Sequence, residues 1–108
     1  MRDMSFLRRF EILLPSRLND GAPIPRPFIG ETLNELRARF GVVSLETQVI
    51  KGQWEYGGVV FRDEVIRIFV DAPRTPSALE FFAAYKETLK SRFQQIEMWI
   101  TAFEIEQI

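Results

Sequence analysis

The sequence predicts an α+β domain in which two helices cover one face of an antiparallel sheet. Three observations support this prediction. β-Branched and aromatic residues dominate two arms, 42–50 and 59–70, that flank a glycine-containing reversal. One amphipathic helical stripe precedes this hairpin and another follows it. Strand-forming runs near both ends of the chain complete the order strand, helix, strand, strand, helix, strand.

Composition fits a single domain spanning residues 1–108 and excludes several function classes. The 14 basic and 15 acidic residues give a net charge of −1, which argues against a nucleic-acid-binding module. The absence of cysteine and histidine excludes disulfides, thiolate or imidazole metal sites, and catalysis by either residue. No stretch suits a membrane span and the N-terminal residues do not resemble a secretory signal, so we expect a cytoplasmic protein.

The N-terminal half is predicted as a strand, a loop and a helix. Apolar residues alternate with a mixed face over Phe6–Leu14, which is typical of a half-buried strand. Residues 16–27 contain an Asn-Asp-Gly turn and three prolines, and therefore form a loop. A helix is expected from about 28 to 40, with Gly41 as its C-terminal stop. Its apolar stripe consists of Ile29, Leu33, Leu36 and Phe40.

The central hairpin is expected to close through a four-residue loop at Glu55–Gly58. This register places Glu46 directly opposite Arg67 as a cross-strand ion pair. Arg62–Glu64 interrupts the second arm and is predicted to be a β-bulge. On the buried face, the register pairs Val43 with Val70, Leu45 with Ile68, and Thr47 with Ile66.

The C-terminal part is predicted as a loop at 71–77, a second helix and a last strand. Either Thr75 or Ser77 caps the helix, which continues to about Gln94. The strand at Ile96–Ile105 is apolar on both faces, so we expect both faces to be covered. The predicted helical stripe is Leu79, Phe82, Ala83, Lys86, Leu89 and Phe93.

With right-handed crossovers, this order gives the ferredoxin-like βαββαβ sandwich. Its antiparallel sheet has the order 4-1-3-2, and both helices lie on one face.

The open face of this sheet is where we expect function. It combines alternating charges with apolar and aromatic residues, and such an area should not face bulk water. We therefore expect a non-enzymatic homodimeric or partner-binding module. The alternative is a small-molecule binder or a cofactor-independent enzyme, with a cleft for a small apolar ligand walled by aromatic residues. Carboxylates beside arginines keep their charged form and make poor general bases, so no catalytic residue is predicted. Neither Asp20 nor Asp63–Glu64 lies in a loop with ligands at several alternating positions, so no metal is predicted, and no cofactor is expected. The candidate ligand or interface residues are Arg9, Glu11, Glu46, Trp54, Arg67, Phe69 and Trp99.

Several short segments carry a resemblance: Phe10–Leu14 with Asn19–Gly21, Gly52–Trp54 with Gly57–Gly58, and Tyr85–Lys86 with Arg92–Gln95. In these segments the chain resembles a small uncharacterised bacterial family with a ferredoxin-like α+β fold. The resemblance implies this fold and carries no catalytic residue, because that family has no established activity. By architecture the chain is also similar to dimeric α+β barrel proteins, some of which are cofactor-independent oxygenases or isomerases. Those enzymes often use a histidine, which this chain lacks.

Overall fold

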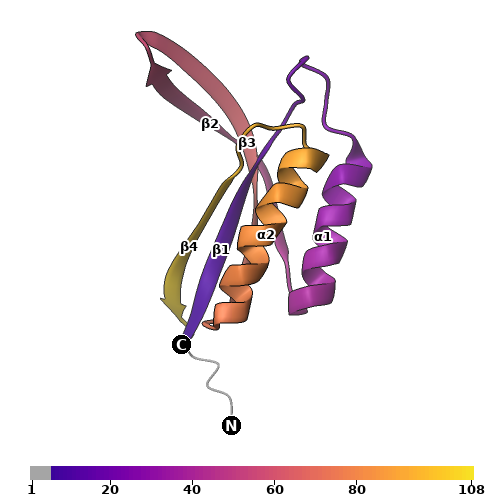
Figure 1. The fold of residues 1–108 in the computed structure, drawn as a ribbon, viewed down its shortest axis with the longest axis vertical. Coiled ribbons are helices and arrows are strands. Elements are labelled where there is room, and N and C mark those ends of the chain that lie inside the picture. Colours follow the sequence, from indigo (N-terminus) through magenta and orange to yellow (C-terminus); the bar gives the residue numbers. More distant parts are fainter. Residues whose placement is uncertain (1–5) are drawn as a thin grey trace.

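The computed structural model describes residues 6–108 and confirms the ferredoxin-like α+β fold (Figure 1). One antiparallel sheet has the order β2-β3-β1-β4, and both helices pack on one of its faces (Figure 1). The predictions of a single domain from residue 1 and of no secretory signal include residues 1–5, which lie outside the described part. The elements are β1 (Phe6–Pro15), α1 (Arg26–Phe40), β2 (Ser44–Tyr56), β3 (Val59–Pro73), α2 (Pro76–Arg92) and β4 (Trp99–Glu106).

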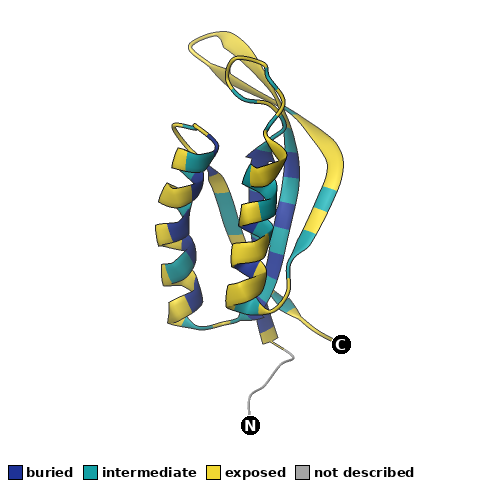
Figure 2. Ribbon diagram, turned by 90° about the vertical axis from the view of Figure 1, so that its right-hand side faces the viewer, coloured by how far each residue is buried: buried dark blue, intermediate teal, exposed yellow. Residues whose placement is uncertain are grey.

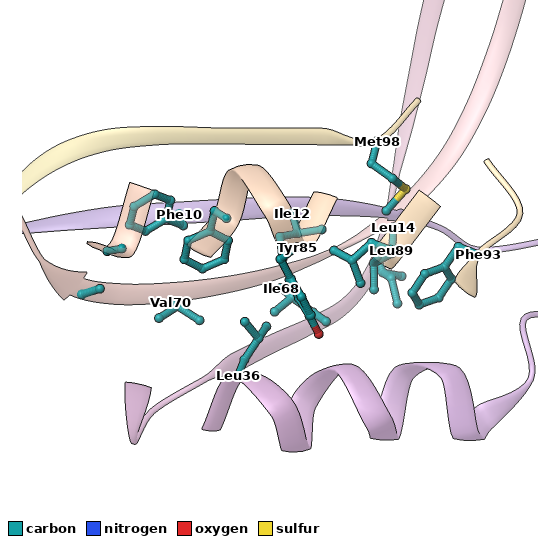
Figure 3. Close-up of a cluster of buried hydrophobic side chains, with 14 residues drawn as sticks. Phe10, Ile12, Leu14, Leu36, Ile68, Val70, Tyr85, Leu89, Phe93 and Met98 are labelled. Atoms are coloured by element: carbon teal, nitrogen blue, oxygen red, sulfur yellow. The ribbon is translucent and has the colours of Figure 1, made fainter. Parts of the chain in front are cut away.

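The core lies between the sheet and the helices (Figure 3). Alternate residues of β1 and β3 supply its sheet side, because successive side chains of a strand point to opposite faces. Phe10 stacks on Phe82 of α2 with ring centroids 4.1 Å apart. The fully buried side chains drawn in Figure 3 include Ile12, Leu14, Leu36, Ile68, Val70, Leu89 and Phe93.

Local capping residues set the end of α1 and the start of α2. Gly41 adopts a φ of 79° beyond α1, so the predicted glycine stop is confirmed. Thr75, and not Ser77, caps α2, since its side chain accepts a hydrogen bond from the Ala78 backbone N–H. Neither helix within residues 6–108 is long and apolar enough to cross a membrane.

The predicted stripe of α2 was rotated relative to the observed one. Leu79 and Ala83 are exposed, whereas Ala78 and Tyr85 are buried. The difference arises because Tyr85 directs its hydroxyl group toward Glu35 of α1 while its ring packs in the core. A tyrosine can therefore occupy a core position when its hydroxyl group has a hydrogen-bond partner.

The hairpin register is confirmed near the sheet centre and wrong beyond it. Glu46 faces Arg67 as predicted. The pairing then shifts between Glu46 and Ile50, so that Ile50, and not Gln48, faces Val65. The pairing of Thr47 with Ile66 is therefore absent. The bulge lies in β2, where three residues oppose a single residue of β3. The predicted bulge at Arg62–Glu64 is absent, because these residues pair regularly with β2.

The turn and the strand ends also differ from the predictions. Tyr56 pairs with Val59, so the turn has two residues, Gly57 and Gly58, with φ of 60° and 81°. Positive φ at both positions allows the twist of the flanking strands to continue through the turn. β2 therefore extends beyond the predicted end at residue 50, and β3 includes Asp71, which was expected in a loop. β4 begins at Trp99, three residues after the predicted start.

A polar network joins the two helices. Arg92 at the end of α2 has a side chain only 13% exposed, and its guanidinium lies 2.6 Å from the Glu35 carboxylate. The same guanidinium donates to the hydroxyl group of Thr32, which is fully buried. Tyr85 donates its hydroxyl hydrogen to Glu35 at 3.1 Å. The network satisfies polar groups that would be costly to bury without partners.

Burial raises the pKa of Tyr85 to about 12, whereas an unfolded tyrosine titrates near 10. The folded state thus holds this proton more tightly. The Tyr85 contribution to stability is complete below pH 10 and is lost as the pH rises through 12. We expect the urea midpoint of the wild type to fall more steeply than that of Tyr85→Phe across this window. Parallel curves for the two proteins would contradict the assignment.

Candidate functional site

The open face of the sheet carries a ladder of ion pairs. Arg9 of β1 binds Asp71 of β3 through two hydrogen bonds of 2.7 and 2.9 Å. Hydrogen bonding to Asp71 raises the pKa of Arg9 above its usual value. Arg67 bridges two strands, since its guanidinium donates to Glu11 and to Glu46, each at 3.0 Å. These contacts cross three of the four strands and fix their alignment.

Phe69 lies between the two arginines of this ladder. The Arg9 guanidinium carbon is 4.4 Å from the ring centroid, and that of Arg67 is 5.5 Å away. Both distances fall within the range of cation–π contacts. The charged groups of this face are therefore engaged with partners of the same chain, and its aromatic ring is partly covered by them.

Beyond the end of β1, β2 and β3 continue as a two-stranded arm. We define the arm as residues 50–65; Val65 still pairs with Pro15, the last residue of β1. Figure 2 shows the outer part of the arm exposed on both faces. Direct pairing places Trp54 beside Phe61 and Tyr56 beside Val59 on one face. The other face carries mostly polar residues: Lys51, Gln53, Glu55, Val60, Arg62 and Glu64.

A cleft of about 940 Å³ opens at the base of the arm. Its walls come from three separate segments: the end of β1 with the following loop, the arm, and the connection from α2 to β4. The loop is tied to that connection because the Asn19 side chain donates to the Gln94 carbonyl oxygen. Leu13, Trp54, Val65, Met98 and Trp99 supply the apolar lining.

Trp54 is the most firmly placed aromatic group of the cleft. Its ring stacks on Phe61 with centroids 4.4 Å apart and planes inclined by 17°. Its indole N–H donates to the Asp63 carboxylate at 2.8 Å. One ring face and one edge are thus held by the arm, while the side chain remains 49% exposed and lines the cleft. This arrangement is a prepared surface for stacking.

The structure places the predicted site residues in two groups. Trp54 lies on the arm, outside the body of the sheet, and shares the cleft with Trp99 at the start of β4. Trp99 is 64% exposed, so no segment within residues 6–108 covers this side of β4. The other group occupies the open face: Arg9, Glu11, Glu46, Arg67 and Phe69.

Sequence reasoning missed three residues of these groups. Asp71 was assigned to a loop because Pro73 follows closely, yet alternation from Arg67 and Phe69 would have placed it on the open face. Asp63 and Phe61 hold Trp54, and their role depends on a register that the bulge in β2 shifts. Among the described residues, no group of three or more acidic side chains could hold a metal ion.

Comparison with known proteins establishes the fold and no family. No family model matches the chain, and no curated protein matches it in sequence. A phage SAM lyase, solved in complex with S-methyl-5′-thioadenosine, superposes with a TM-score of 0.64 at 11% identity. The superposition covers 99% of this chain and 95% of that one. The resemblance to an uncharacterised bacterial family stays a prediction.

Arg67→Ala is expected to lower the free energy of unfolding by about 1–2 kcal/mol, because it removes two charge-assisted hydrogen bonds on a half-buried face. Arg74→Ala is the matched control, since its pair with Glu104 is more exposed. That variant should lose less than about 0.5 kcal/mol. Urea unfolding of both variants measures the difference, and equal losses would show that the bridge does not stabilise the sheet.

Proposed function

We propose that this protein is a small-molecule-binding module that holds a planar ring in the cleft at the base of the arm. The observation that carries the proposal is the placement of Trp54, which Phe61 and Asp63 hold with part of its ring surface exposed in the cleft. The cleft volume of about 940 Å³ lies within the usual range for small-molecule sites.

The ligand class that we propose is an adenine nucleoside with an apolar thioether substituent. The structural neighbour is described in complex with S-methyl-5′-thioadenosine, a molecule of this class, and this supports the choice of probe. The flat base suits stacking on Trp54, and apolar residues such as Met98 suit the thioether. Polar residues of the loop after β1 and of the connection to β4, such as Arg17 and Gln95, also line the cleft and can hydrogen-bond the ribose and the ring nitrogens.

Binding of S-methyl-5′-thioadenosine is expected to be measurable by isothermal titration calorimetry. Trp54→Ala should weaken it by about 1–3 kcal/mol, the usual contribution of a stacked base. Phe6→Ala is the control, because Phe6 is similarly exposed but does not line the cleft. Undetectable binding to the wild type at millimolar ligand would discard this ligand class. If both variants weakened ligand binding equally, the binding site would not lie in the cleft.

We further propose that the module binds without catalysing a reaction. Three carboxylate residues line the cleft, and two of them are already engaged: Asp63 accepts the indole N–H of Trp54, and Glu97 pairs with Lys86 at 2.8 Å. The third, Glu64, pairs with Lys51 of β2 on the face of the arm opposite to Trp54. The hydrogen bond from Lys86 lowers the pKa of Glu97, so this group stays ionised near neutral pH and is a poor proton donor.

Incubation with SAM tests whether the module catalyses a reaction, since the structural neighbour is named a SAM lyase. Chromatography should return SAM at the same level as a protein-free sample. Faster loss of SAM with the wild type than with Trp54→Ala would show that the cleft is an active site.

A further inference from the structure

The arm presents an apolar face that no part of the described chain covers. We define the arm face by the side chains of Ile50, Trp54, Tyr56, Val59 and Phe61, which are 39–77% exposed. A two-stranded hairpin gains little stability of its own from such residues in water. Their accumulation on one face, opposite a mainly polar face, is typical of a surface that packs against another protein.

The arm face and the open face of the sheet lie on the same side of β3. Phe61, Val65 and Phe69 are separated by even numbers of residues along this strand. The extra residues of the bulge lie in β2, so the alternation of side chains along β3 is not interrupted. The adjacent open face adds two uncovered aromatic side chains of β4, Trp99 and Phe103, which are 64% and 45% exposed. The two patches border the cleft at the base of the arm, which Trp54 and Trp99 both line, so a protruding partner can contact both patches.

We propose that a second copy of this chain covers the arm face, with the arm of each copy lying against the open sheet face of the other. The exposed aromatic and aliphatic side chains of the arm face present on the order of 400 Å² of apolar surface, and Trp99 and Phe103 add roughly 200 Å². Two copies would bury about 1,200 Å², the lower limit for a specific interface. The arm faces alone would bury only about 800 Å², which is typical of non-specific contacts.

Charge also favours a second copy over a different partner. The arginines of the open face are paired with carboxylates of the same chain, as Arg9 is with Asp71 and Arg67 with Glu11 and Glu46. These groups leave a net charge of only −1, because three carboxylates face two arginines, and so small an excess is a weak basis for selecting an oppositely charged protein. Each chain carries both a protruding arm and an open sheet face. In an isologous dimer each copy can therefore place its arm on the sheet face of the other.

The test compares neighbouring arm residues that point to opposite faces. Val59 and Val60 are 54% and 49% exposed, and only Val59 belongs to the arm face. Dilution series by light scattering should show a concentration-dependent dimer for the wild type. Val59→Ser should raise the dissociation constant at least about tenfold, because a half-exposed valine is lost from each of the two copies, whereas Val60→Ser should leave it unchanged. Tyr56→Ser and Glu55→Ser form a second matched pair.

Fluorescence gives an independent reading. The chain has two tryptophans, so Trp99→Phe leaves Trp54 as the only indole. Its emission should shift to shorter wavelength as the concentration rises through the dissociation constant. A wild type that stays monomeric up to about 1 mM overturns the proposal. So does a dimer that Val59→Ser and Val60→Ser weaken equally.

The proposal does not rest on ligand binding. Tyr56 and Val59 do not line the cleft, so variants at the arm tip should still bind S-methyl-5′-thioadenosine. Trp54→Ala affects both surfaces and is not used to test the dimer. A variant that loses the dimer but still binds the ligand, or one that loses the ligand but still dimerises, therefore tests one proposal without the other.

Discussion

The register of β1 against β3 is the constraint on which the rest of the structure depends. In both strands, one set of alternate side chains fills the core under the helices, and the other set forms the ion-pair ladder of the open face. A slip of one residue would move Ile68 to the open face and bring Arg67 under the helices. The two-bond pair of Arg9 with Asp71 can form in one register only, so charge and burial select the same alignment.

The arm is stabilised by different means from the sheet. It has no helix above it, and local features hold it: the Gly57–Gly58 turn, the Trp54–Phe61 stack, and the hydrogen bond from Trp54 to Asp63. These contacts order the arm without burying it. A long hairpin that is well formed but exposed offers little to the stability of the domain, and both proposals therefore use it as a binding surface.

Much of the fold could be predicted because local sequence carried the information. Glycine at Gly41 permits the left-handed conformation that ends α1, and the Thr75–Pro76 pair starts α2. The opposition of Glu46 and Arg67 was predicted from a four-residue loop; the observed turn has two residues, and the bulge in β2 offsets that difference, so the predicted pair is retained. The length of the arm was missed because Gly52 and the aromatic residues after it were interpreted as a loop. The bulge in β2 was misplaced because nothing in its local sequence distinguishes it from regular strand.

The sequence by itself determined the order of the elements, the apolar faces and the absence of cysteine and histidine chemistry. These follow from side-chain type and spacing along the chain. Only the tertiary structure decided that Trp54 and Trp99 share a cleft, that Arg67 bridges two carboxylates, and that Tyr85 is buried. Each of these depends on residues distant in sequence, whose meeting requires the strand register and the bulge to be known. A shift of two residues in one strand keeps every side chain on its face but changes which side chains are neighbours.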